Sequence, residues 1–157
     1  MSLRLDYNAA SAGGMKALGS VYGYVQRSGL GRDLVNLVYL RVSLINGCAY
    51  CIDMHSRDLL EHGMAIAKLV LVPAWREGGR LFDDRERAAL DWAETVTRVS
   101  ATGVPDQDYE NARAVFSADE LSDLTIAIGL MNAYNRLAIS FRNPPAAVVA
   151  LEEADAA

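Results

Sequence analysis

The chain has 157 residues and a mass of 17.0 kDa, the size of one domain. Its net charge of −5 excludes the basic surface that nucleic-acid binding requires and a cationic amphipathic face for a membrane. Apolar residues make up 52% of the chain, more than a small monomer needs, so we expect part of the surface to be buried against another subunit.

Helical periodicity runs through the whole chain and strand patterns are almost absent, which predicts an all-α fold. We expect Gly47 and Gly63 to end the second and third helices and Pro73–Phe82 to form a loop. The predicted helices, in chain order, cover Met15–Arg27, Asp33 (as N-cap) to Asn46, Cys48–Glu61, Ala65–Leu71, Asp83–Asp84 (as cap) to Val99, Gln107–Val115 and Leu121–Ser140.

Ser117 and Glu120 fit a capping box for the last long helix, and we expect the tail beyond Leu151 to fray. There is no linker, repeat or low-complexity block, so residues 1–157 are expected to form a single domain. The N-terminus lacks the apolar segment of a secretory signal, and polar residues interrupt the apolar run from Leu124 to Phe141. These features predict a cytoplasmic protein without a membrane span.

Both cysteines and both histidines lie in one short stretch, from Cys48 to His62. Cysteine and histidine are the side chains best suited to redox or acid–base chemistry near neutral pH. In the reducing cytosol, a Cys-x-x-Cys pair is more often catalytic or metal-binding than a structural disulfide. The stretch is therefore the candidate functional site.

On a helix of about 100° per residue, Cys51, Asp58, His55 and His62 fall within about 90° of Cys48. The two sulfurs would lie within reach of a disulfide, and the His55 imidazole would lie one turn from Cys51. Because Gly47 ends the preceding helix, both sulfurs belong to a first helical turn, where free N–H groups lower a thiol pKa. The pattern predicts a reactive dithiol.

Other interpretations of the same residues carry less weight. Cys48 and His55 would lie about 10.5 Å apart along an intact helix, too far to share a tetrahedral zinc ion. Cys51 could also be an inert core residue. Asp58 could orient the imidazole or be a solvated carboxylate, and His62 could bind the last helical carbonyls instead of taking part in chemistry. We expect no metal and no cofactor.

Two other groups of polar residues lie on apolar helices. Asn36, Tyr39, Ser43 and Asn46 form a stripe on the helix before the cysteines, and this stripe faces either solvent or the dithiol. On the same helix, Arg41 lies off the stripe and is expected to bind a carbonyl or carboxylate in the core. The last long helix carries a second group, which we expect to form a hydrogen-bond network at a subunit interface: Asn132, Asn135 and Arg136.

The segment Leu40–His55 resembles the core motif of the AhpD-like alkylhydroperoxidases, in the carboxymuconolactone decarboxylase superfamily. The resemblance covers nearly the whole chain. It extends through Met15–Leu18, Leu71–Arg76, Glu86–Glu94 and Asn132–Phe141. It implies an AhpD-like helical domain that assembles into homotrimers or homohexamers.

The resemblance also implies an activity, the reduction of organic hydroperoxides or hydrogen peroxide in antioxidant defence. In the family scheme the second cysteine attacks the peroxide and the first resolves it, which assigns these roles to Cys51 and Cys48. His55 would be the proton relay. A dithiol donor, either a lipoyl-bearing or a thioredoxin-like protein, would restore both thiols.

The chain departs from the family pattern at two positions. A glutamate that starts the proton relay is replaced by Asn36, which cannot accept a proton. The histidine found between the cysteines in one branch of the family is Tyr50. His55 would then act alone, or another carboxylate such as Asp58 or Glu61 would replace the glutamate, or peroxide turnover would be weak.

Three rival functions remain. A general thiol–disulfide oxidoreductase or redox sensor would use the same sulfurs, and the missing glutamate favours it. Lactone decarboxylation, the superfamily's other activity, does not depend on a Cys-x-x-Cys pair, so the pair counts against it. A structural or ligand-binding oligomer would leave the cysteines without a role.

Overall fold

In the computed structural model, which describes residues 3–155, every regular element is a helix, as predicted. The α-helices are α1 (Tyr7–Ala10), α2 (Ala12–Val25), α3 (Arg32–Asn46), α4 (Ala49–Glu61), α5 (Ile66–Leu69), α6 (Asp84–Thr97), α7 (Val99–Thr102), α8 (Asp106–Arg113), α9 (Ala118–Phe141) and α10 (Ala146–Asp155). Two short 3₁₀ helices, η1 (Val72–Glu77) and η2 (Gly79–Leu81), join α5 to α6.

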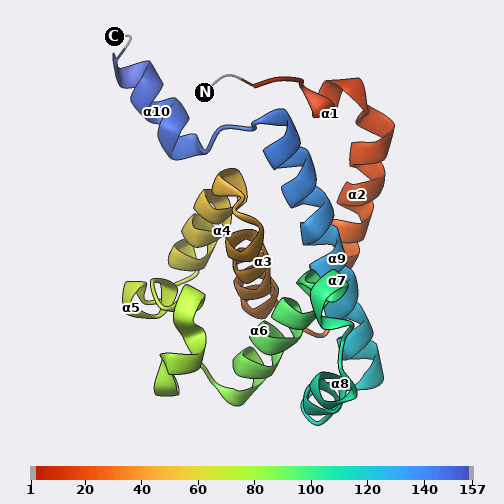
Figure 1. Cartoon of the computed structure of the whole chain (residues 1–157). Helices are drawn as coiled ribbons and strands as arrows, with labels where there is room; N and C mark the ends of the chain where they lie inside the picture. Colours follow the sequence, from red (N-terminus) through yellow and green to blue (C-terminus); the bar gives the residue numbers. More distant parts are fainter. Residues whose placement is uncertain (1–2, 156–157) are drawn as a thin grey trace.

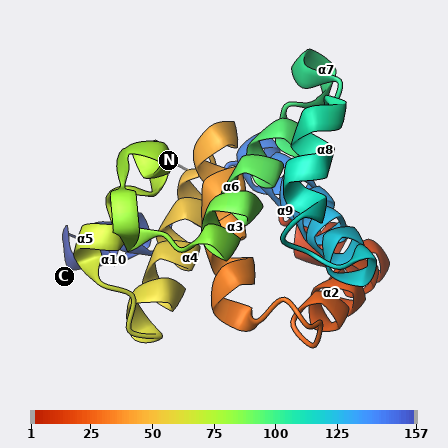
Figure 2. The same ribbon diagram turned by 90° about the horizontal axis from the view of Figure 1, so that it is seen from below.

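Helix α3 lies at the centre of the fold and packs against α4, α6 and α9 (Figures 1 and 2). Its buried residues cover almost its whole circumference, from Leu34 to Ser43, which is the pattern of a helix surrounded by others. Helix α2 lies along α9, and α10 extends from the body at the end where both termini lie (Figure 1). The cysteine-bearing helix α4 therefore rests directly on the central helix.

The predicted capping signals are confirmed at three helix ends. Asp83 and Glu86 form a reciprocal capping box at the start of α6, and Ser117 and Glu120 form another at the start of α9. Gly47 ends α3 in the left-handed conformation, at φ 71°, which a residue with a Cβ adopts only at a cost. This turn folds α4 back against α3.

The predicted N-cap of α3 is wrong. Gly31, not Asp33, precedes the first helical residue, so the Asp33 carboxylate lies in the first turn of α3. There its Oδ1 atom lies 3.0 Å from Nδ1 of His62, the residue that caps the end of α4. The carboxylate thus joins two helix ends and does not cap its own helix.

Four further segments differ from the sequence-based expectation. The predicted loop Pro73–Phe82 is mostly 3₁₀ helix, which anchors the buried Trp75. The tail expected to fray beyond Leu151 continues as α10 to Asp155. Short helices α1 and α7 were not predicted, because four residues are too few to show a periodicity.

Arg41 binds a buried carboxylate, as the sequence suggested. Its Nε and Nη2 atoms lie 2.9 Å and 2.7 Å from Glu94 Oε1, which also accepts a 2.7 Å hydrogen bond from the Trp75 indole. Arg76 Nη1 lies 2.6 Å from the other oxygen, Oε2. Burial alone would raise the pKa of Glu94, but these donors outweigh it and lower that pKa. The cluster attaches η1 to α3 and α6.

None of the helices within residues 3–155 is both long and apolar enough to cross a membrane.

Candidate active site

Cys48 and Cys51 lie at the start of α4, both free and both buried. Cys48 is the N-cap residue, and its Sγ accepts a 3.4 Å hydrogen bond from the backbone N–H of Cys51. The two sulfur atoms are 2.7 Å apart. The pair is thus placed within disulfide reach, as the spacing predicted.

The two thiols have different acidities. The pKa of Cys48 is lowered to about 7, chiefly because the Cys51 thiol donates a hydrogen bond to its sulfur. The backbone amides of the first turn lower this pKa further, whereas burial raises it. The pKa of Cys51 is raised, because its thiol is the donor and because it is buried. The sequence predicted acidification of the pair without this asymmetry. Cys48 is therefore the first of the two thiols to ionise.

His55 lies one turn after Cys51, and its side chain is 1% exposed. Burial lowers its pKa from 6.5 to about 4, so the imidazole is neutral at pH 7. Neither ring nitrogen has a hydrogen-bond partner among the described residues. Asp58 Oδ2 lies 3.7 Å from Nδ1, too far for a hydrogen bond, and the His55 ring centre lies 5.2 Å from that of Tyr39.

The polar stripe of α3 faces the protein interior and not solvent. Asn36, Tyr39 and Ser43 are buried, and Asn46 is half-buried. Within the described part of the chain, Asn36 Oδ1 and the Tyr39 hydroxyl have no hydrogen-bond partner. Ser43 accepts a hydrogen bond from Asn135 of α9.

The amides of α9 form a network with α3, so Asn135, which was predicted at a subunit interface, lies inside the protomer instead. Asn135 is fully buried; its Nδ2 donates to Ser43 Oγ at 3.0 Å, and its Oδ1 accepts from Asn46 Nδ2 at 2.9 Å. Asn132 Oδ1 accepts from Asn46 Nδ2 and from Arg136 Nη1, each at 3.0 Å. The sequence showed that these groups need partners but not that α3 supplies them.

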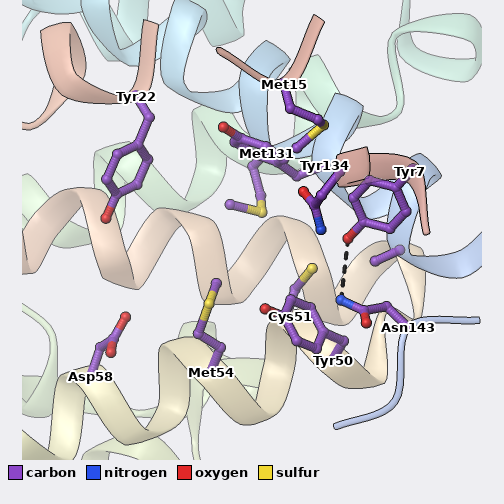
Figure 3. Close-up of a pocket in the computed structure, with 12 residues that line it drawn as sticks. Tyr7, Met15, Tyr22, Tyr50, Cys51, Met54, Asp58, Met131, Tyr134 and Asn143 are labelled. Carbon is purple, nitrogen blue, oxygen red and sulfur yellow. Dashed lines mark hydrogen bonds between the residues drawn. The ribbon is translucent and has the colours of Figure 1, made fainter. Parts of the chain in front are cut away.

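A cavity of about 290 Å³ opens onto Cys51. Figure 3 shows the Cys51 sulfur beneath Tyr7, with Met54 and Met131 beside it and with Tyr22 and Asp58 at the far end. Near Cys51, Asn143 Nδ2 donates a 3.2 Å hydrogen bond to the Tyr7 hydroxyl. Most of the lining side chains are tyrosines or methionines: Tyr7, Tyr22, Tyr50, Tyr134, Met15, Met54 and Met131.

A second cavity, of about 330 Å³, opens onto Cys48. It lies between the start of α4, the end of α9 and the segment that leads into α10. Its walls are mainly apolar, and Arg142 adds a guanidinium group. Tyr50, Ala138 and Asn143 line both cavities, so the two cysteines line different cavities that share a wall.

The remaining candidate residues do not join the dithiol. The His62 side chain pairs with Asp33, and it is the backbone N–H of His62 that bonds the last carbonyls of α4. Within residues 3–155, no group of three or more His, Cys, Asp or Glu side chains could hold a metal ion.

Comparison with known families and proteins gives consistent results. The profile of the carboxymuconolactone decarboxylase family matches residues 13–95. The chain is 33% identical to the uncharacterised protein YdfG of Bacillus subtilis, over 91% of this chain and 97% of YdfG. It is 36% identical to the uncharacterised protein YnjA of Escherichia coli, over 68% of this chain and 58% of YnjA.

Solved structures share the fold. A protein of unknown function from Agrobacterium tumefaciens, for which a role as the antioxidant defence protein AhpD has been suggested, is 40% identical. It superimposes with a TM-score of 0.88 over 92% of this chain and 98% of its own. A peroxidase-related protein from Silicibacter is 25% identical, with a TM-score of 0.74 over 83% of this chain and 69% of its own.

Proposed function

The chain belongs to the carboxymuconolactone decarboxylase family, and from this premise we propose that it is a dithiol peroxidase. The observation that carries the proposal is the pair of sulfurs 2.7 Å apart, one of which faces a cavity. The names of the Agrobacterium and Silicibacter proteins, antioxidant and peroxidase-related, agree with this chemistry.

In the proposed reaction, the Cys51 thiolate attacks one oxygen of the hydroperoxide. The O–O bond breaks, the leaving alkoxide takes the proton held by the Cys48 thiol and departs as the alcohol, and Cys51 becomes a sulfenic acid. The Cys48 thiolate that this leaves then attacks the Cys51 sulfur, the S–O bond breaks, and the leaving hydroxide takes a proton from solvent and departs as water, so that the two cysteines form a disulfide. A donor dithiol reduces this disulfide and is itself oxidised to a disulfide.

The proposed reaction needs no carboxylate to remove the first proton. Loss of one proton from the two thiols gives one thiolate and one thiol, and the remaining proton lies between sulfurs that are 2.7 Å apart. Transfer of the shared proton to Cys48 leaves the thiolate on Cys51, which lines the cavity. Because the pKa of Cys48 is about 7, a large fraction of the pair carries a thiolate at neutral pH.

The lining of the first cavity favours a hydroperoxide with an apolar body. Tyrosine rings and methionine thioethers provide apolar contact area, and the tyrosine hydroxyls and Asn143 provide a few polar contacts. We therefore propose an organic hydroperoxide as the substrate. For the donor, we propose a lipoyl-bearing or thioredoxin-like dithiol that approaches Cys48 through the second cavity.

The direct test measures peroxide consumption with a dithiol reductant, for the parent, Cys51→Ser and Cys48→Ser. We expect no turnover by Cys51→Ser, and by Cys48→Ser a single turnover that leaves a sulfenic acid on Cys51. Mass spectrometry after one equivalent of cumene hydroperoxide should show a Cys48–Cys51 disulfide in the parent. Equal rates for the three proteins would refute the peroxidase.

Asn36 favours a second candidate, a thiol–disulfide oxidoreductase with little peroxide turnover. The amide cannot accept a proton, and the neutral His55 has a pKa of only about 4. Replacement Asn36→Glu separates the two candidates, with Asn36→Gln as the uncharged control of the same size. A large gain in peroxide turnover with Glu alone would mean that the missing carboxylate limits the site. An unchanged rate would support deprotonation within the dithiol.

Self-assembly is the remaining proposal. Several large apolar side chains are more than half exposed: Tyr24 (51%), Val99 (55%), Ile66 (61%), Val70 (61%) and Leu151 (66%). Their exposure is consistent with burial in a homotrimer or homohexamer. Light scattering coupled to size exclusion would give the number of subunits, and a monomer would refute the assembly.

A further inference from the structure

Two segments from opposite ends of the chain meet at the cavity of Cys51. Tyr7 begins α1, whose first N–H groups are capped by the Asp6 carboxylate, and Asn143 follows the end of α9. The backbone N–H of Arg4 donates a 2.9 Å hydrogen bond to the Phe141 carbonyl, and the ring centres of Tyr7 and Phe141 lie 5.7 Å apart. These contacts hold the Tyr7 ring in place without using its hydroxyl.

The Tyr7 hydroxyl is oriented and still has a proton to donate. The Asn143 amide donates a 3.2 Å hydrogen bond to the phenol oxygen, and this bond does not use the phenol proton. Within residues 3–155, that proton has no acceptor. Burial, Tyr50 and Cys51 raise the pKa of Tyr7, so the phenol keeps its proton at pH 7. Figure 3 shows the hydroxyl on the side of the ring that faces Cys51 and Asn143.

The other polar groups around this cavity are placed less well for donation. An ionised Asp58 can only accept hydrogen bonds. In the described part of the chain, no hydrogen bond fixes the direction of the three other tyrosine hydroxyls that line the cavity, those of Tyr22, Tyr50 and Tyr134. Tyr7 is therefore the tyrosine of this cavity whose hydroxyl is held in a defined direction.

A fixed donor at this position matches a need of the proposed reaction. As the O–O bond breaks, negative charge develops on the oxygen that leaves, in a cavity lined mainly by aromatic rings and thioethers. A donor that is already in place stabilises such a charge without reorganising during the reaction.

We propose that the Tyr7 hydroxyl is a catalytic group that donates a hydrogen bond to the departing oxygen of the hydroperoxide, and that Asn143 is its positioning residue. Tyr7 keeps its proton, and the alkoxide still takes its proton from the Cys48 thiol. This role rests on the proposed function, because it adds a residue to the same step. Neither residue lies within 13–95, the part of the chain that the family profile matches.

The experiment compares two peroxides whose leaving groups differ in basicity. Cumene hydroperoxide loses an alkoxide, whereas peracetic acid loses acetate, a far weaker base that needs little stabilisation. The rate of the first turnover is measured at saturating peroxide, without a donor dithiol, by counting free thiols after rapid quenching. Tyr7→Phe should slow cumene hydroperoxide about ten- to hundred-fold, the effect of one hydrogen bond to a charged oxygen, and peracetic acid by less than about three-fold.

Tyr109→Phe is the matched control. It removes the same atom from a tyrosine that also packs on an aromatic ring, with its centre 6.4 Å from that of Trp92, and Tyr109 is outside the described walls of both cavities. This variant should keep the parent's rate with both peroxides.

Asn143→Leu tests the positioning role. It should slow cumene hydroperoxide by a smaller factor than Tyr7→Phe does. In the Tyr7→Phe background it should have little further effect, because the hydroxyl that it positions is already absent. Full additivity of the two substitutions would refute the positioning by Asn143.

Equal slowing of both peroxides in Tyr7→Phe would mean that the hydroxyl only supports the structure, and the catalytic role would be refuted. If the parent consumes cumene hydroperoxide and Tyr7→Phe matches its rate, the role of Tyr7 is refuted and the peroxidase stands. If the parent consumes neither peroxide, the peroxidase and the role of Tyr7 are refuted together.

Discussion

The buried His55 should make the protein sensitive to mild acid. Its pKa is lowered from 6.5 to about 4, so between these values the unfolded chain binds a proton that the folded protein does not. The stabilising contribution is therefore complete above pH 6.5 and is lost as the pH falls towards 4. The difference of about 2.5 units corresponds to about 3 kcal/mol of unfolding free energy at 1.36 kcal/mol per unit.

The perturbation that isolates this effect is His55→Gln, because glutamine does not titrate. Urea unfolding at pH 7.0 and pH 4.5 gives the loss of unfolding free energy for each protein, to which the carboxylates also contribute. We expect the parent to lose about 2.5 kcal/mol more than His55→Gln over this interval. The comparison cancels any constant cost of the glutamine.

His62→Gln is the control for this prediction, since it removes the other histidine of the chain. His62 pairs with Asp33 at 3.0 Å, and its side chain is 25% exposed. Loss of the acid sensitivity in His55→Gln but not in His62→Gln would assign it to the buried imidazole. If His55→Gln loses as much stability in acid as the parent, the imidazole is not neutral in the folded state and its burial has been misjudged.

Three further substitutions test the structure around the site. Glu94→Gln should lower the unfolding free energy, measured by urea unfolding, by about 3 kcal/mol, because it leaves Arg41 and Arg76 without their carboxylate. Trp75→Phe removes one hydrogen bond to that carboxylate and should cost about half as much. Gly47→Ala should cost about 1–2 kcal/mol through its positive φ alone, since no atom lies within 4 Å of the added Cβ, and a cost near zero would contradict the strain. Ala138→Leu projects into both cavities and should raise the KM for cumene hydroperoxide more than that for hydrogen peroxide, whereas an equal effect on both would argue against this cavity as the organic-substrate site.

The parts of the fold that could be predicted from the sequence depend on neighbours along the chain. The cap at Asp83 and the capping box at Ser117 act over three residues, and the approach of Cys48 to Cys51 is a property of one helical turn. The left-handed Gly47 is likewise a local preference. Each of these was predicted because backbone geometry alone determines the contact.

The remaining parts depend on contacts between distant segments. Asn135 and Ser43 are separated by 92 positions, and Arg41 and Glu94 by 53. A pattern on one helix shows that a polar group needs a partner, but the partner's identity is set by how helices pack. The Asn135 network was for this reason assigned to a subunit interface, and Asp33 was assigned to its own helix instead of to His62.

The dithiol supplies its own hydrogen-bond donors at a site where Asn36 stands in place of the glutamate. A carboxylate at position 36 would accept a proton, but its negative charge would also oppose a thiolate in a buried site. Asn36 adds no charge, and the thiol and the backbone N–H of Cys51 both donate to the Cys48 sulfur. Neutral donors fixed by packing are screened little by salt, in contrast to surface charges. The thiolate population should then depend on pH, and only weakly on ionic strength.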